Sequence, residues 1–172
     1  MADLHIADLL DLEYLEAAIE AGLVRVQQHP TEPLGIYNYT ERCAYEQAWS
    51  PVTLTCRGLI VDANGWVKAR PLRKFFNFGD PMAGELDASA KAVVVDKLDG
   101  SLGILYPSSA GWAIATRGSF ASGQALHATE VLGQRYLDFT PPEGVTVLWE
   151  IIYPENRIVC DYGGADDLFL LG

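Results

Sequence analysis

Lys97 lies in a short polar segment, 96–101 (DKLDGS), between two apolar runs, 92–95 (AVVV) and 102–106 (LGILY). Each run is typical of a buried strand. A lysine held between core strands is partly desolvated, which lowers its pKa and raises the fraction of free amine able to attack a phosphorus or carbonyl atom. Gly100 would let the chain approach a ligand closely, and Ser101 would offer a hydroxyl group. The same pattern also fits a salt-bridged surface lysine before a tight Asp-Gly turn, so both interpretations stand at this point.

Five further segments accompany Lys97 along the chain: 57–60 (RGLI), 74–77 (KFFN), 116–120 (TRGSF), 149–159 (WEIIYPENRIV) and 168–172 (LFLLG). Glu150 lies in an otherwise apolar strand, where a buried charge without a partner costs several kcal/mol, so we expect it to have a functional partner. The stretch 55–75 carries five basic residues and one acid, whereas the whole chain has a net charge of −11. Such a local excess of positive charge is suited to binding phosphates.

These segments carry a resemblance to a known superfamily. Lys-x-Asp-Gly-Ser followed by an apolar strand resembles motif I of the covalent nucleotidyltransferases, which include ATP-dependent ligases and mRNA capping enzymes. The three segments after Lys97 resemble motifs Ia, III and IIIa in the same order. The Arg-Gly and Lys-Phe-Phe-Asn segments before it resemble ATP-dependent RNA ligases of the phage RNA ligase 1 type and fungal tRNA ligases, and DNA ligases and capping enzymes do not carry this arrangement. The resemblance covers residues 57–172, and residues 1–50 carry no motif that we can name.

The resemblance implies a reaction and a role for each matched residue. Lys97 would attack the α-phosphate of ATP to form lysyl-AMP and pass the AMP to an RNA 5′-phosphate, and a 3′-hydroxyl would then displace the AMP and seal the strand. Arg57 and Lys74 would contact the ATP phosphates, and Glu150 would hold the ribose or a hydrated Mg²⁺ (or Mn²⁺) ion. The other nucleotide-binding residues implied are Phe76, the backbone around Asp96 and Leu98 at the adenine edge, Gly100, and Arg117. RNA ends are the expected partners, with tRNA and an end-healing kinase or phosphatase as further candidates.

Two elements of the family are not found in their usual places. No lysine follows Lys97, so these 172 residues hold no Lys-x-Lys pair of motif V. The segment 143–145 (EGV) resembles motif IV, but it precedes the motif III segment and is better interpreted as a turn. We therefore expect either the front part of a longer ligase or a natural short form that seals RNA poorly alone. A non-catalytic nucleotide- or RNA-binding module is the alternative, and nucleotide transfer to DNA or a cap is a third hypothesis.

Composition excludes several other classes of protein. The chain is 49% hydrophobic and 20% charged, which is ordinary for a globular domain, and no run approaches the roughly 18 apolar residues of a membrane span. Its N-terminus carries acids where a signal peptide would carry bases, so we expect a cytoplasmic, intracellular protein. The net negative charge argues against a general nucleic-acid coat protein. Cys43, Cys56 and Cys160 are widely spaced, so we expect reduced, structural cysteines instead of a disulfide framework or zinc site.

The elements that must position these residues are mostly short strands. Helices are predicted over 6–21, over 41–48 with Thr40 as its cap, and over 123–137 with Leu126, Val131, Leu132 and Tyr136 in the core. Strands are predicted over 23–28, 35–39, 54–62, 66–71, 74–78, 92–96, 102–106, 112–116, 145–153, 157–162 and 168–172. This pattern predicts an α+β fold built on antiparallel sheets, and the resemblance implies the nucleotidyltransferase fold with flanking helices. We expect one domain over 1–172, in which 1–50 form a helix-and-strand extension of unknown role.

Overall fold

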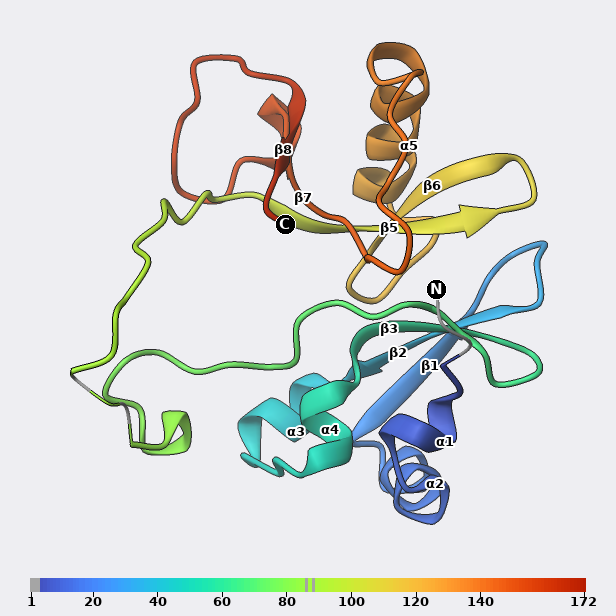
Figure 1. Ribbon diagram of the computed structural model, residues 1–172, viewed down its shortest axis with the longest axis vertical. Helices are drawn as coiled ribbons and strands as arrows, with labels where there is room; N and C mark the ends of the chain where they lie inside the picture. The colour runs from blue at the N-terminus through green and yellow to red at the C-terminus, as the bar shows by residue number, and fades with distance from the viewer. Residues whose placement is uncertain (1–3, 86, 88) are drawn as a thin grey trace.

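Two four-stranded antiparallel sheets lie face to face in the computed structural model, which describes residues 4–85, 87 and 89–172 (Figure 1). The first sheet has the strand order β1 (Val24–Gln28), β2 (Leu34–Tyr39), β3 (Arg57–Asp62) and β4 (Val67–Ala69). The second has the order β6 (Gly111–Thr116), β5 (Ser101–Ser108), β7 (Leu148–Ile152) and β8 (Asp167–Leu170). The α+β class with antiparallel sheets is therefore confirmed.

Helices cover the outer side of each sheet. Helices α1 (Ile6–Leu9), α2 (Leu12–Glu20) and α4 (Pro51–Thr55) pack on the first sheet, and α3 (Glu41–Tyr45) lies beside α4. Helix α5 (Gly123–Arg135) packs on the second sheet (Figure 1). Two short 3₁₀ turns, η1 (Pro81–Ala83) and η2 (Pro154–Asn156), lie in the connections. The long connection from β4 to β5 runs out to one side of the two sheets, and it contains Lys97 (Figure 1).

Three apolar layers hold this arrangement together. The layer between the sheets joins Ile36 and Ile60 of the first sheet to Ile104 of the second. A second layer lies between the first sheet and α1, α2 and α4, and a third lies between the second sheet and α5. Complete burial of an isoleucine side chain stabilises a fold by about 1.5–3 kcal/mol, so the middle layer fixes the distance between the two sheets.

The helices differ from prediction at their ends. The helix expected over 6–21 is two helices, because the carboxylate of Asp11 accepts hydrogen bonds from the backbone of Glu13 and Tyr14 and so begins α2 as its N-cap. Thr40 caps α3 as predicted, through the amide of Cys43. Residues 54–55, expected to begin a strand, instead end α4.

Three predicted strands are absent from the described chain, namely 74–78, 92–96 and 157–162. The valines Val93, Val94 and Val95 are 83%, 92% and 79% exposed, so the run is neither a strand nor buried. A strand needs a neighbouring chain for its backbone hydrogen bonds, and no described strand pairs with these segments. In α5 the expected core residues Val131 and Leu132 are buried, whereas Leu126 is 60% exposed and that prediction is wrong.

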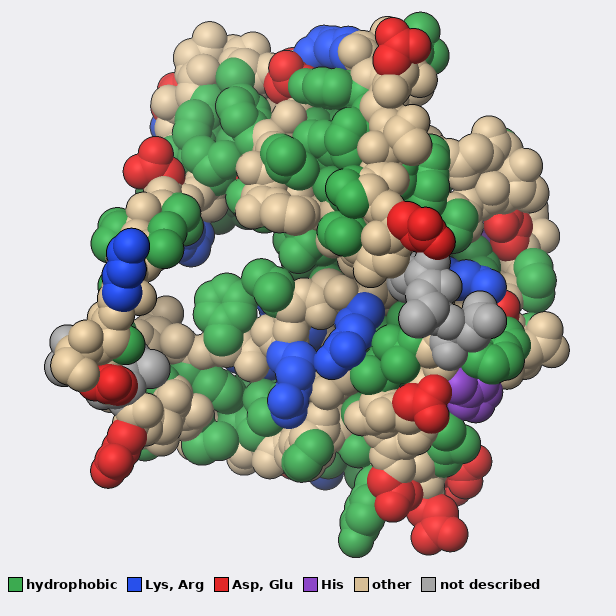
Figure 2. Space-filling model, in the orientation of Figure 1, with side chains coloured by type: hydrophobic (Ala, Val, Ile, Leu, Met, Phe, Trp, Pro, Cys, Tyr) green, Lys and Arg blue, Asp and Glu red, His purple; other side chains and the backbone are tan. Residues whose placement is uncertain are grey.

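Charge is distributed unevenly over the surface. Figure 2 shows acidic side chains gathered at the lower end of the molecule, over α1 and α2, and basic side chains in the middle of the view. The basic stretch 55–75 includes β3, β4 and the start of the connection to β5. Among the described residues no helix is long and apolar enough to cross a membrane.

Candidate functional site

A polar row crosses the first sheet at the ends of β1, β2 and β3. Arg25 pairs with Asn38 across β1 and β2, and Asn38 pairs with Arg57 across β2 and β3. Directly paired residues point to the same face of a sheet, so these three side chains form one row. The pairing shifts by one residue after Tyr37, and Gly58 has a φ of +90° at this irregularity.

Gly58 also brings the two sheets together. A Cβ atom at this position would lie 2.4 Å from Ile104 Cδ1 and 3.3 Å from the backbone of Arg117. Only glycine adopts this φ readily and leaves that space free. The turn after β6 can therefore approach β3, and Arg117 stands opposite the polar row.

A cavity of about 430 Å³ opens between the row and this turn. Its lining residues are Arg25, Asn38, Arg57, Gly100, Ser101, Leu102, Thr116, Arg117, Gly118 and Gln124. Three of these ten are arginines and none is an acid, although the chain as a whole is strongly acidic. The cavity therefore concentrates positive charge in one place and favours anionic ligands.

Arg117 is fixed by an aromatic cluster at the edge of the cavity. Its Nη1 donates to Tyr39 Oη at 2.9 Å, and its guanidinium lies 5.0 Å from the centre of the Tyr39 ring. Trp49 meets the Tyr39 ring edge-on at 5.1 Å and the Phe76 ring at 5.4 Å. The Lys74 ammonium lies 4.2 Å from the centre of the Phe76 ring. Lys74 and Phe76 are thus connected to Arg117 through Trp49 and Tyr39, although no strand forms around them.

The segment after Lys97 is held by the opposite sheet. Glu150 in β7 accepts a hydrogen bond from the Gly100 amide, with 2.8 Å between Oε1 and the nitrogen. A Cβ atom on Gly100 would lie 2.5 Å from the Ile151 carbonyl oxygen, so this glycine permits close approach of β7. Gly100 also lines the cavity, and its approach to a ligand stays a prediction. Asp99 accepts from the amides of Val159 and Cys160 at 2.7 and 2.9 Å.

The partner expected for Glu150 therefore includes a backbone amide. Burial raises the pKa of the Glu150 carboxyl, and the Gly100 amide and the positive charges of Lys97 and Arg57 oppose that rise. Burial also lowers the pKa of the Arg57 guanidinium, and the like charge of Arg117 acts in the same direction. The charges of Lys97 and Arg57 thus act on the Glu150 carboxyl, and the charge of Arg117 acts on the Arg57 guanidinium.

Lys97 itself is exposed, and the prediction that it lies between two core strands is wrong on the upstream side. Its Nζ lies 3.5 Å from the Leu98 carbonyl oxygen. Its positive charge adds to the effect of the Cys160 and Val159 amides, which lower the pKa of the Asp99 carboxyl. Asp96 is also exposed, and neither Asp96, Lys97 nor Leu98 lines the cavity, which begins at Gly100.

Three residues of the cavity, Arg25, Asn38 and Gln124, lie outside the segments singled out in the sequence. Arg25 and Asn38 belong to the first 50 residues, which carry no recognisable motif, and so do Tyr39 and Trp49 at its edge. Arg25 is the only basic residue before Arg42, and this isolation in an acidic segment was the one available signal. Residues 24–39 supply two strands of the first sheet, so this region builds one wall of the site.

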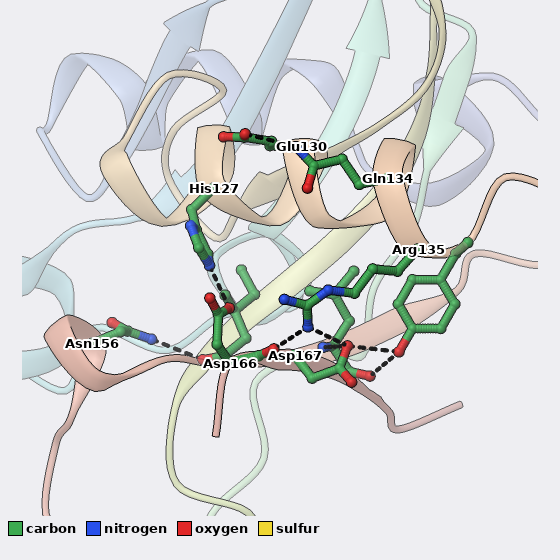
Figure 3. Close-up of polar contacts among 10 residues, drawn as sticks. His127, Glu130, Gln134, Arg135, Asn156, Asp166 and Asp167 are labelled. Carbon is green, nitrogen blue, oxygen red and sulfur yellow. Dashed lines mark hydrogen bonds and ion pairs between the residues drawn. The ribbon is translucent and has the colours of Figure 1, made fainter. Parts of the chain in front are cut away.

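A polar network on the far side of the second sheet holds β8 in place (Figure 3). His127 Nε2 lies 2.7 Å from Asp166 Oδ1, and the two side chains point toward each other from α5 and from the end of the loop before β8. Tyr136 Oη donates to Asp167 Oδ1 at 2.7 Å, and Arg135 lies 3.8 Å from the same oxygen. Because β8 pairs with β7, the network supports the strand that carries Glu150.

The described residues include no group of three His, Cys, Asp or Glu side chains that could hold a metal ion. Glu150 offers one carboxylate beside a cavity suited to phosphates. Mg²⁺ usually keeps several waters and binds through one or two carboxylates together with substrate phosphates. Glu150 therefore fits a water-mediated magnesium contact that depends on a phosphate ligand.

Comparison with known proteins shows similarity to a viral protein. No family model matches the chain. Over 98% of its length the chain is 28% identical to the "Putative bifunctional polynucleotide kinase/RNA ligase" of Autographa californica nuclear polyhedrosis virus. The chain spans 28% of the length of that viral protein. The similarity supports an RNA-ligase-like relationship for the chain.

Proposed function

We propose that this chain carries the adenylyltransferase site of an ATP-dependent RNA ligase, with the nucleotidyltransferase fold of the phage RNA ligase 1 and fungal tRNA ligase type. The observation that carries the proposal is the meeting of Arg57, Arg117 and Glu150 around the segment that follows Lys97. The Lys-x-Asp-Gly-Ser motif and the similarity to a viral protein named as an RNA ligase support the same reaction.

In the proposed reaction, Lys97 Nζ attacks the α-phosphorus of ATP. A nitrogen–phosphorus bond forms while the bond to the bridging oxygen breaks, pyrophosphate leaves, and the amine gives its proton to solvent. An oxygen of an RNA 5′-phosphate then attacks the same phosphorus, which breaks the nitrogen–phosphorus bond and restores the lysine. In the last step a 3′-hydroxyl attacks the 5′-phosphate, and AMP leaves as the strand is sealed.

The proposed roles follow from where the side chains lie. Arg57 lines the cavity and would neutralise phosphate charge, and Lys74, which lies over the Phe76 ring, would act with it. Phe76 would contribute an apolar surface for the nucleotide. The backbone around Asp96 and Leu98 would meet the adenine edge, and Glu150 would hold the ribose or a hydrated metal ion. Magnesium or manganese would neutralise further phosphate charge when bound.

Labelling with α-³²P-ATP and Mg²⁺ tests the first step. We expect a covalent tag that is lost in acid and stable in base, as a phosphoramidate is, and Lys97→Ala should abolish it. Lys91→Ala is the matched control, because Lys91 is an exposed lysine of the same connection and should leave the tag unchanged. A tag of full intensity on the Lys97→Ala variant would overturn the assignment of the nucleophile.

A non-catalytic nucleotide-binding module is the second candidate. The observation that favours it is the exposure of Lys97 and of the three valines before it, which leaves the lysine held from one side only. ATP binding that saturates in equilibrium titration while no covalent tag forms, with either Mg²⁺ or Mn²⁺, would support this candidate against the enzyme.

A further inference from the structure

We propose that Arg25, Asn38 and Arg117 form a phosphate-binding subsite at the end of the cavity made by β1, β2 and the turn after β6. Arg25 and Asn38 have no role in the reaction proposed above. The subsite would hold a phosphate group of either ATP or RNA, so the inference extends the proposed function. Its evidence is the geometry and charge of these three residues, and it does not depend on the chemistry of Lys97.

The side chains of Arg25 and Asn38 converge on one point. A Cβ atom on Gly118 would lie 3.2 Å from Arg25 Nη2 and 3.8 Å from Asn38 Nδ2. Since Gly118 follows Arg117 directly, the guanidinium of Arg25 and the amide of Asn38 meet at the backbone of the turn that carries Arg117. Arg25 pairs with Asn38 across β1 and β2, so the rigid sheet fixes their spacing.

Asn38 has hydrogen-bonding capacity that the described residues leave unused. Its side chain is 8% exposed, and its amide nitrogen donates to the Tyr39 carbonyl oxygen at 2.8 Å. An amide nitrogen has two hydrogens, and this bond uses one of them. Its Oδ1 is buried and has no partner among the described residues. A bound phosphate would accept the second Nδ2 hydrogen, whereas the unpaired Oδ1 is itself an acceptor and takes no part in binding it.

The charge of the subsite selects an anion with several oxygens. Arg25 and Arg117 both line the cavity, and no carboxylate is among its lining residues. Guanidinium groups bind phosphate through paired, charge-assisted hydrogen bonds. A tetrahedral phosphate offers oxygens to donors that approach from different directions, as these do from β1, β2 and the turn after β6. A phosphate group therefore fits the donor set.

Equilibrium binding to the Lys97→Ala chain tests the subsite without covalent reaction. The probes are inorganic tripolyphosphate, a short RNA with a 5′-phosphate, and the same RNA with a 5′-hydroxyl. We expect Arg25→Gln to weaken binding of at least one phosphate probe by roughly tenfold to a hundredfold, the effect of losing a charged hydrogen bond. Lys91→Gln is the matched control, since it removes one positive charge from an exposed residue of the connection between β4 and β5 that does not line the cavity.

The pattern of loss identifies the source of the phosphate. A loss confined to tripolyphosphate assigns the subsite to the nucleotide tail, and a loss confined to 5′-phosphorylated RNA assigns it to the RNA end. Equal losses for both RNAs assign it to a backbone phosphate. Unchanged binding of all three probes, or the same loss in Lys91→Gln, would overturn the proposal. All binding is measured on the Lys97→Ala chain, which cannot form lysyl-AMP. The result is therefore independent of whether Lys97 is the nucleophile.

A second variant, Gly118→Ala, tests the subsite at the turn after β6. In Gly118→Ala the new methyl group would lie 3.2 Å from Arg25 Nη2 and should shift this flexible end by a few tenths of an ångström. We expect a loss of a few fold for the same probe that Arg25→Gln weakens. Gly133→Ala is the control, because a Cβ atom there meets nothing within 4 Å. Thermal melts of all variants confirm that each is folded, and a normal affinity in folded Gly118→Ala contradicts the proposed convergence.

Discussion

The chain on the two sides of Lys97 behaves differently. Downstream, Asp99 and Gly100 are bonded to the 159–160 backbone and to Glu150, and β5 begins one residue later. Upstream, the valines 93–95 are exposed and belong to no strand. Both flanks are equally apolar in sequence, so hydrophobicity alone does not separate them.

This difference shows where the position of the candidate nucleophile comes from. The downstream flank pairs with β6 and β7 and is held by the Glu150 side chain of β7 and by backbone amides of the loop after it. The upstream flank has no such neighbour among the described strands. We infer that β7 and its loop position the Lys97 segment, while the upstream connection leaves the lysine side chain free to move. The predictions that follow test this contrast, from the largest expected effect to the smallest.

Gly100→Ala should produce the largest loss of stability. The new Cβ atom would lie 2.5 Å from the Ile151 carbonyl oxygen, which is backbone and cannot rotate away. Forcing an extra carbon into such a contact typically costs about 1–3 kcal/mol. Urea unfolding of the variant against Gly133→Ala measures the difference. Equal midpoints for the two variants would contradict the tight approach of β5 to β7.

Glu150→Ala should produce a smaller loss, and a conservative variant separates its two roles. Removing the carboxylate deprives the Gly100 amide of its acceptor, which costs about 1 kcal/mol. Glu150→Gln keeps an acceptor oxygen and buries no charge, so it should unfold at nearly the same urea concentration as the parent chain. Both variants should lose adenylylation if the carboxylate serves the ribose or metal ion. Full labelling of a stable Glu150→Gln chain would assign Glu150 a purely structural role.

Prediction from sequence succeeded where a structural feature is determined by residues that are adjacent in the chain. Glu150 stood out because a charge in an apolar strand needs a partner, and the structure supplies the Gly100 amide. The gap between the strands predicted over 54–62 and 66–71 correctly separates β3 from β4, because a turn is determined by adjacent residues. The run 92–96 failed as a strand because pairing depends on a distant neighbour.

The cavity wall formed by Arg25 and Asn38 was not predicted, because it too depends on residues that are distant in the chain. Arg25 and Asn38 reach the site through the strand pairing β1–β2–β3 and the irregularity at Gly58. The register of these strand pairs depends on contacts between residues up to about thirty positions apart. A short segment of sequence does not contain both partners and so cannot predict the register. The residues around Lys97 were found by motif, whereas the residues that face them could be found only from the fold.

The Asp99 contacts should respond to acid in a narrow range. Backbone amides of Cys160 and Val159 lower the pKa of this carboxyl below its unfolded value of about 3.9. A group whose pKa is depressed by folding stabilises the folded state above the unfolded pKa, and this contribution is lost as pH falls through the folded pKa. The amide resonances of Val159 and Cys160 should therefore hold constant from neutral pH to about 5 and move only below about 4. Asp99→Asn should remove this movement, and a transition in the parent chain above 5 would contradict the assigned contacts.

Val94→Ser should have the smallest effect on stability. Its side chain is 92% exposed, so the substitution removes little buried apolar surface and should change the free energy of unfolding by less than about 0.5 kcal/mol. Val147→Ser is the counterpart beside the second sheet, where the valine is 3% exposed and the same substitution buries a hydroxyl group. Urea unfolding should show a clear loss for Val147→Ser and almost none for Val94→Ser. If Val94→Ser were as destabilising as Val147→Ser, the upstream flank would be packed as firmly as the downstream one, and Lys97 would be held from both sides after all.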